Sequence, residues 1–92
     1  MPMDAGEIER MIREALPDAQ VARAILEGRL STFDTTSVSW DEAIGEIEGL
    51  SQADLARIAD ESAKRTLLAG RERVETSDLL AAITERKAAA RR

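Results

Sequence analysis

The strongest helical pattern of the chain lies between Ser51 and Gly70. Apolar and small residues recur there at intervals of three and four, and at 100° per residue they fall on one connected arc. Ser51 is suited to cap the first turn, Asp54 complements the helix dipole, and Gly70 is suited to the positive φ at which helices often stop. Leu68 is an exception because it projects among the charged residues of the opposite arc, which include Arg57. The predicted buried arc consists of Leu55, Ile58, Ala59, Ser62, Ala63, Leu67 and Ala69.

A first amphipathic helix is predicted before Pro17. Asp4 and Glu7 have the spacing of a capping box, and Pro17 places a boundary near Leu16 because it disfavours α geometry in the preceding residue. The apolar stripe of this segment needs cover, since an isolated helix of this length is only marginally stable in water. The stripe consists of Ile8, Met11, Ile12, Ala15 and Leu16.

Residues 18–30 predict a second helix that is apolar over more than half of its circumference. A helix with that much apolar surface is expected to be covered on two sides. The main side is expected to consist of Val21, Ala24, Ile25 and Gly28, widened by Ala22, Leu26 and Leu30.

A loop and a short third helix are predicted next. The polar stretch 31–38 is typical of a loop, and Phe33 and Val38 are expected to anchor it in the core. Ser39 and Glu42 form a second capping box, and Gly49 is expected to stop the helix that begins there. The apolar positions of this helix are Trp40, Ala43, Ile44 and Ile47.

The last helix is predicted to begin shortly after Val74, which is expected to make one extended contact. Thr76 or Ser77 is expected to cap this fifth helix, and its stripe consists of Leu79, Ala82 and Ile83. Beyond Thr84 the apolar period is lost, so the end of the chain is expected to fray. The basic residues there are expected to compensate the helix dipole and aid solubility: Arg86, Lys87, Arg91 and Arg92.

Composition favours a single all-α domain. Hydrophobic residues make up 43% of the 92 residues and aromatics only 2%, with Trp40 and Phe33 the only rings. Such a balance favours helices over strands. We therefore expect a small bundle of about five helices.

Composition also excludes several kinds of chemistry. The chain has no cysteine and no histidine, which removes disulfides, thiolate metal sites and the commonest general base. The phosphate-binding pattern Gly-x-x-x-x-Gly-Lys-(Ser/Thr) is absent from the sequence, and we expect no enzyme activity. A net charge of −5 argues against nucleic acid as the main partner. No apolar run approaches the roughly 20 residues of a membrane span, and nothing resembles a signal peptide, so a cytoplasmic protein is expected.

Two motifs at the starts of the last two helices resemble the small C-terminal lid subdomain of AAA-family ATPases. The first is Gly49-Leu50-Ser51-Gln52-Ala53-Asp54-Leu55, followed by an alanine-rich helix. The second is Arg73-Val74-Glu75-Thr76-Ser77-Asp78-Leu79-Leu80. The resemblance covers about residues 16–88, so residues 17–92 are expected to form an AAA-lid-like helical domain containing four of the helices.

The resemblance implies one binding site and no catalytic or metal-binding residue. In intact AAA proteins the start of the long lid helix closes over the adenine and ribose of ATP bound in the large domain. The matching positions here are Gly49, Ser51, Gln52, Ala53 and Asp54, of which Gln52 stands where the family usually has a second glycine. A lid without its large domain supplies only one wall of that pocket, so no cofactor is expected in the isolated chain.

Residues 1–16 do not belong to the lid pattern. The segment from Glu7 to Ala19 is similar to the opening helix of BolA-like proteins, but the strands of that family and its histidine are absent. No BolA function is therefore carried over. Two explanations stay open: the chain was joined near Pro17, as an engineered chimera or natural fusion, or a lid fragment carries an N-terminal extension.

Three functions follow as hypotheses. The first is a non-catalytic lid module for nucleotide sensing and subunit contact, with an ATPase large domain as its partner. The second is a free-standing protein-interaction or homodimerisation module. The third, a histone-fold-like DNA binder, is disfavoured by the acidic balance. For a homodimer, the expected interface consists of Ile8, Met11, Ile12, Leu16 and Leu68, with Leu26 and Leu30 completing the patch around Leu68.

Overall fold

The structure, a computed structural model, describes residues 18–90. Its four helices confirm the all-α class for this part of the chain, while the expected helix before Pro17 lies outside the described residues. The helices are α2 (Ala19–Arg29), α3 (Trp40–Gly45), α4 (Gln52–Leu68) and α5 (Thr76–Ala90).

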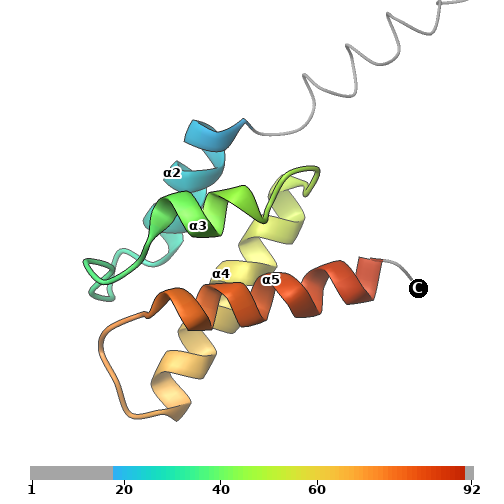
Figure 1. Ribbon diagram of the computed structural model, residues 1–92. Coiled ribbons are helices and arrows are strands. Elements are labelled where there is room, and N and C mark those ends of the chain that lie inside the picture. The colour runs from blue at the N-terminus through green and yellow to red at the C-terminus, as the bar shows by residue number, and fades with distance from the viewer. Residues whose placement is uncertain (1–17, 91–92) are drawn as a thin grey trace, which may run out of the picture.

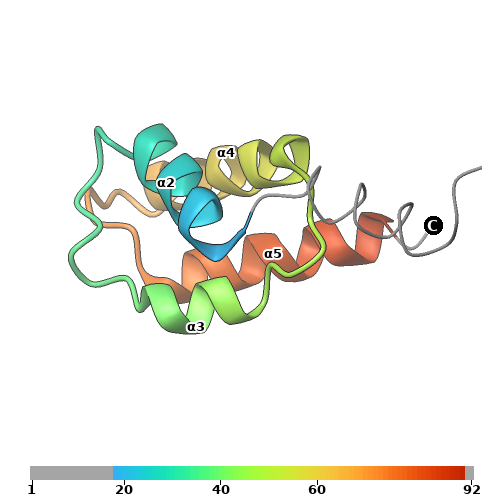
Figure 2. The ribbon, with the colours of Figure 1, turned by 90° about the horizontal axis from the view of Figure 1, so that it is seen from above.

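The long helix α4 packs against two neighbours. It contacts α5 on one side and α2 on another, and α3 contacts both α5 and α2 (Figure 1). Seen from above, α2 and α4 form one layer and α3 and α5 form the other (Figure 2). Every helix therefore buries one face between the two layers.

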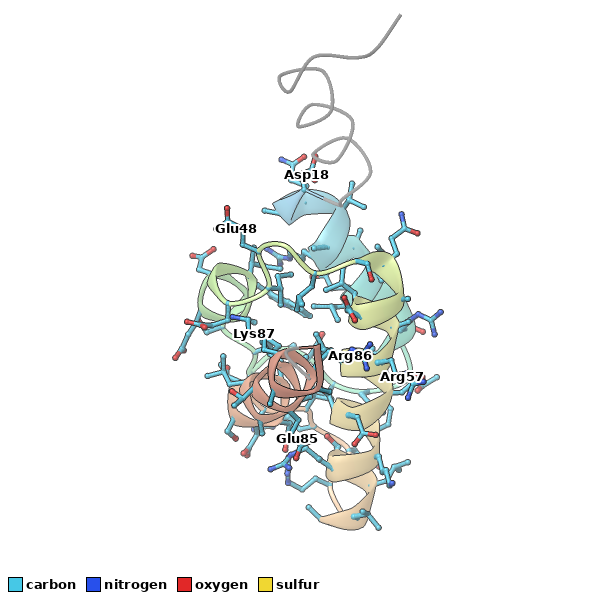
Figure 3. All side chains as sticks on the ribbon, turned by 90° about the vertical axis from the view of Figure 1, so that its right-hand side faces the viewer. Asp18, Glu48, Arg57, Glu85, Arg86 and Lys87 are labelled. Carbon is cyan, nitrogen blue, oxygen red and sulfur yellow. The ribbon has the colours of Figure 1, made fainter. Side chains whose placement is uncertain are left out.

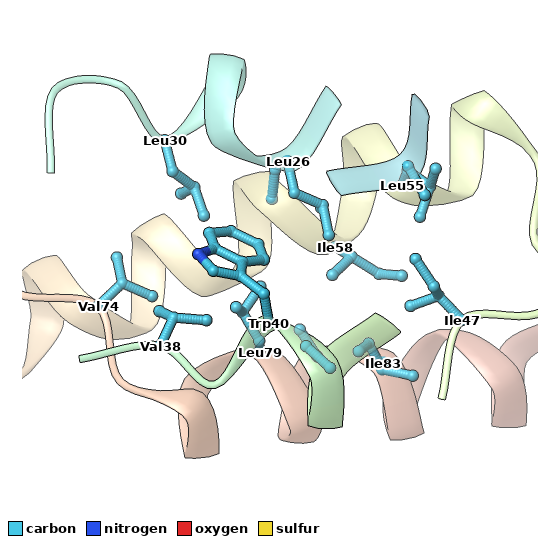
Figure 4. Close-up of a cluster of buried hydrophobic side chains, with 14 of the residues drawn as sticks. Leu26, Leu30, Val38, Trp40, Ile47, Leu55, Ile58, Val74, Leu79 and Ile83 are labelled. Carbon is cyan, nitrogen blue, oxygen red and sulfur yellow. The ribbon is translucent and has the colours of Figure 1, made fainter. Parts of the chain in front are cut away.

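One hydrophobic cluster fills the space between the layers. Trp40, the only tryptophan, lies near its middle, between Leu30 of the upper layer and Leu79 of the lower one (Figure 4). The guanidinium of Arg23 lies 5.4 Å from the centroid of the Trp40 ring, within cation–π range. The buried apolar residues are Ala22, Leu26, Leu30, Val38, Trp40, Ala43, Ile47, Leu50, Leu55, Ile58, Ala59, Val74, Leu79, Ala82 and Ile83.

The buried side of α2 differs from the expected one. Ala22 and Leu26, followed by Leu30 just past the helix, are buried, whereas Val21 is 43% exposed. Ala24 and Gly28 are exposed as well. The prediction that Val21, Ala24, Ile25 and Gly28 form the main side was wrong, because the larger leucines fill the core. Of these four residues only Ile25 packs against it, half-buried.

The third helix is shorter than expected. It ends at Gly45, and its N-cap Ser39 makes no side-chain capping bond, so the predicted capping box is absent. The Ser39 amide instead donates to the Thr76 hydroxyl at 2.8 Å. Trp40, Ala43 and Ile47 are buried as predicted. Gly49 adopts a φ of +85° and lies in the turn between α3 and α4 rather than at the end of α3.

The buried arc of α4 was predicted correctly over its first three turns and incorrectly over the last. Leu55, Ile58, Ala59 and Ser62 are buried, but Thr66 faces the core while Leu67 is 66% exposed. Ala69 is exposed too. The Ser62 hydroxyl donates to the Ile58 carbonyl and the Thr66 hydroxyl to the Ser62 carbonyl, at 2.8 and 2.9 Å. These local bonds let two polar side chains occupy core positions without an unsatisfied group.

Gly70 stops α4 as predicted. Its φ is +71°, its amide donates to the Leu67 carbonyl at 3.0 Å, and the Arg71 amide donates to the Thr66 carbonyl at 3.1 Å. This pair of bonds is the Schellman motif. A side chain at this position would be strained, since positive φ favours glycine.

A short parallel bridge ties the loop after α2 to the loop before α5. The Asp34 amide donates to the Glu72 carbonyl at 3.0 Å, and the Val74 amide donates to the Asp34 carbonyl at 2.9 Å. Val74 is fully buried. Its predicted extended contact is confirmed, as is the anchoring of the first loop, because Val38 is buried and Phe33 packs against the core.

The helix α5 begins and ends differently from the prediction. Thr76 and Ser77 are its first residues rather than its caps, and the helix continues to Ala90. The Asp78 carboxylate accepts from the Glu75 amide at 2.9 Å and so takes the capping role. The expected fraying after Thr84 was wrong within the described residues. Arg86 pairs with Asp54 of α4, and Lys87 pairs with Glu46, just after α3.

Truncation of Leu55 or Ile58 to alanine is expected to lower the free energy of unfolding by about 2–4 kcal/mol, the usual cost of a cavity at a fully buried aliphatic position. Each side chain is 1% exposed. Arg57→Ala, on the exposed side of α4, is expected to change it by only about 0.5 kcal/mol. Urea unfolding followed by Trp40 fluorescence measures all three. A larger loss for Arg57→Ala than for either aliphatic variant would contradict the observed packing of α4.

Candidate functional site

The segment Gly49–Asp54 forms the turn that leads into α4. Leu50 is buried and anchors the turn, and its amide donates to the Ile47 carbonyl at 3.1 Å. Gly49, Gln52 and Ala53 are exposed, and Ser51 and Asp54 are half-buried. The turn therefore presents two surface residues, Gln52 and Ala53, between the anchored Leu50 and Asp54.

A reciprocal capping box holds the start of α4. The Ser51 hydroxyl accepts from the Asp54 amide at 3.2 Å, and Asp54 Oδ2 accepts from both the amide and the hydroxyl of Ser51 at 3.0 Å. The Ser51 cap predicted from the sequence is confirmed. The second half of the box, in which Asp54 reaches back to Ser51, fixes the turn as well as the helix.

Arg86 of α5 completes this arrangement. Its Nε donates to Asp54 Oδ1 at 2.6 Å, and Figure 3 shows the side chain directed from α5 toward α4. The Ser51 amide, followed by the Arg86 guanidinium, lowers the pKa of Asp54 below its ordinary value. Asp54 is thus held as a carboxylate whose two oxygens both accept hydrogen bonds. It is therefore poorly suited to act as a general base.

A second arginine–carboxylate cluster lies at the opposite end of the α4–α5 pair. Asp78 is only 4% exposed and accepts from Arg71 through two bonds of 2.9 and 3.1 Å. Arg65 of α4 lies 3.9 Å from the same carboxylate. The hydrogen bonds from Arg71, together with the Glu75 amide, lower the pKa of Asp78.

The two arginine–carboxylate clusters are built in a similar way. Asp54 and Asp78 are each the third residue of their helix, and each accepts from the amide of the residue just before that helix. Asp54 also binds Arg86 of α5, whereas Asp78 binds Arg71, which lies in the loop after α4. The sequence analysis did not identify Arg86 or Arg71 as partners. The detectable signal was an acidic residue at the third position of both helices, with a basic residue near the end of each.

Two shallow surface depressions flank α4. One lies beside Gln52 and is lined by Ala24, Ile25, Gly28, Arg29 and Gln52. The other lies between α4 and α5, with a floor of Ile58 and Ala82 and a rim that includes Arg57, Glu61 and Arg86. Neither gathers a catalytic set of side chains. Within residues 18–90, no three acidic side chains are placed to hold a metal ion.

The predicted dimer interface is described only in part. Ile8, Met11, Ile12 and Leu16 lie outside the described residues. Leu68 is 79% exposed, in agreement with its prediction as an outlier from the buried arc. The patch expected around it was wrong, because Leu26 and Leu30 are fully buried. Leu67, which was predicted to be buried, is exposed beside Leu68.

No family model matches the chain, and no curated protein matches it. The resemblance to AAA lids therefore depends on the two motifs alone. Among the described helices, none is long and apolar enough to cross a membrane.

Acidification is expected to destabilise the protein through its engaged carboxylates. Their pKa values in the folded state lie below the unfolded value of about 4, so their stabilisation is present above that pH and is lost as pH falls through the folded values. Besides Asp54 and Asp78, this group includes Asp34, whose pKa is lowered first by the Thr36 hydroxyl. The melting temperature is expected to be nearly constant from pH 7 to 5 and to drop below pH 4.

Asp78→Asn tests the contribution of the buried carboxylate. It is expected to cost about 1–3 kcal/mol at pH 7, because a hydrogen-bonded charge is lost, and to cost progressively less as pH falls below the ordinary aspartate value of about 4 and the wild-type carboxylate takes up its proton. Asp60→Asn is the control, since its side chain is 75% exposed and lies 4.0 Å from Arg29. Thermal melts across this pH range measure the effect, and equal losses for Asp78→Asn at pH 7 and pH 2 would contradict it.

Proposed function

We propose that residues 17–92 act as a non-catalytic lid module of the kind found in AAA-family ATPases, which senses nucleotide and contacts subunits in the cytoplasm. The partner in this proposal is a separate ATPase large domain. Two features support it: the order of the helices agrees with the expected four-helix lid, and both family-like motifs occur at helix starts. The N-terminal segment 1–16 is then an addition to the lid, fused or native.

The observation that carries the proposal is the rigid presentation of the Gly49–Asp54 turn. A lid has to offer a fixed wall to a nucleotide held by another domain, because a mobile wall would lose binding energy on ordering. Here the exposed Gln52 and Ala53 lie between Leu50, buried in the core, and Asp54, bonded to both Ser51 and Arg86. The buried Leu50 and the bonds of Asp54 therefore fix the turn.

Gln52 sets a limit on this function. Its exposed side chain occupies the position where the family usually has glycine, the residue that allows closest backbone approach. A nucleotide at this wall would have to contact the Gln52 side chain or displace it. We expect weaker nucleotide contact than a glycine would allow.

A second candidate function is a protein-interaction module, favoured by two adjacent leucines at the end of α4. Leu67 and Leu68 are 66% and 79% exposed, and neighbouring exposed leucines are typical of a contact surface when they are part of a larger apolar patch. This function needs no nucleotide.

The isolated chain is expected neither to hydrolyse ATP nor to bind it measurably. In the proposal the phosphates are held by the large domain, and the chain lacks a phosphate-binding loop. A titration with ATP and Mg²⁺, followed by Trp40 fluorescence and phosphate release, measures both. Turnover that survives repurification would contradict the non-catalytic assignment.

The lid assignment itself is tested by adding the chain to an AAA large domain from which the native lid has been deleted. We expect binding and a gain in ATP hydrolysis, with a further gain for Gln52→Gly. Gln20→Gly is the matched control, because Gln20 is an exposed glutamine in the first turn of α2. If the chain neither binds such domains nor changes their turnover, the lid assignment is wrong.

A further inference from the structure

The helix α2 carries a second apolar stripe of which the core uses only Ile25, whose half-buried side chain packs against the core cluster. This outer stripe consists of Val21, Ala24, Ile25 and Gly28, at the spacing of one helix face. Val21 is 43% exposed, Ala24 and Gly28 are exposed, and Ile25 is half-buried. The opposite side of α2, with Ala22 and Leu26, is already buried.

The outer stripe is shaped to receive another helix. Ala24 and Gly28 are four residues apart and line one shallow groove together with Ile25, Arg29 and Gln52. A Cβ added at Gly28 would meet nothing within 4 Å, so the space above it is open. Larger side chains spaced four apart on a second helix can enter such a groove.

We propose that the outer stripe binds residues 5–16 of a second copy of this chain. The sequence predicts an amphipathic helix there, and Ile8 and Ile12 have the four-residue spacing of Gly28 and Ala24. A helix of 12 residues is about 18 Å long, close to the roughly 16 Å of α2. The apolar stripe of the segment and the outer stripe of α2 thus match in length and in spacing.

Charge favours an antiparallel arrangement of the two helices. The segment has the acidic residue Glu7 near its start, just after Asp4, and α2 ends with Arg29, whose side chain is 52% exposed. In the antiparallel arrangement Ile8 lies over Gly28 and Ile12 over Ala24.

The connection to α2 favours a second copy over the chain's own segment. Only Pro17 and Asp18 lie between the segment and α2, and a two-residue loop is the shortest that antiparallel helix pairs use. Asp18 is extended, with φ −76° and ψ 177°, and its side chain accepts from the Val21 amide at 2.8 Å. Pro17 has a fixed φ and disfavours helical geometry at Leu16. Exchange between two copies avoids this reversal and covers both outer stripes in one symmetric dimer.

The inference deepens the second proposed function and does not depend on nucleotide. It moves the docking surface from Leu68, at the far end of α4, to the exposed side of α2. Failure of the lid assignment in the ATPase experiment would leave it intact, and failure of the dimer would leave the lid assignment intact.

The variant Gly28→Glu tests the outer stripe of α2 as a docking surface. Light scattering measures the oligomeric state of the full chain across micromolar concentrations. The wild type is expected to dimerise, and the variant to associate at least about tenfold more weakly, because it buries an unpaired charge in the interface. Gly45→Glu is the matched control, since a Cβ there also meets nothing within 4 Å, and it should dimerise as the wild type does. Circular dichroism and melting temperature establish that both variants keep their fold.

Introduced cysteines distinguish exchange from folding back, because the chain has none of its own. When Ile8→Cys and Gly28→Cys chains are mixed under mild oxidation, a disulfide-linked heterodimer is expected. A mixture of Ile8→Cys and Gly45→Cys is the control and should not form one.

Three results would overturn the proposal. The first is a wild-type chain that stays monomeric at high micromolar concentration. The second is a dimer that Leu68→Glu disrupts and Gly28→Glu does not. The third is a chain carrying both Ile8→Cys and Gly28→Cys that closes its disulfide within one molecule, which would assign the stripe to the chain's own segment.

Discussion

The structure depends on covering α4 from two sides. Its buried residues, from Leu55 through Thr66, contact α5 across the layers and α2 within its own layer. Neither neighbour could bury its own apolar face without α4, and a helix of α3's six residues has too few internal hydrogen bonds to persist alone. Cooperative folding of residues 18–90 follows from this shared face.

The ends of the α4–α5 pair are held by charge rather than by apolar contact. Asp54 and Asp78 each cap a helix. Asp54 binds Arg86 of α5, and Asp78 binds Arg71 of the α4–α5 loop, with Arg65 of α4 3.9 Å away. A carboxylate that accepts from an amide and a guanidinium at once links local capping to tertiary packing. The bond from Arg86 to the capping residue Asp54 explains how α5 stays helical to Ala90, although its last turns have little apolar surface to bury.

The sequence predicted the two ends of α4 better than the buried faces of α2 and α4. Ser51 and Gly70 were identified correctly because capping and positive φ depend on neighbours within one turn. The buried side of α2 and the position of Thr66 were not, because the choice between two apolar sides, or between a leucine and a threonine, depends on what packs opposite. The Asp54–Arg86 bond joins residues 32 positions apart, a pairing that no local pattern specifies. The Gly49–Asp54 turn could be located from its motif, but its rigidity could not.

The bridge between Asp34 and Arg73 has a consequence for the loops that it joins. Loops are ordinarily the parts of a small protein whose amides exchange with solvent first and whose backbone a protease reaches first. Here the amides of Asp34 and Val74 are bonded to carbonyls far away in the sequence, and Val74 is fully buried. Their hydrogen exchange should therefore require opening of the core itself, so these two irregular segments share the lifetime of the helices around them.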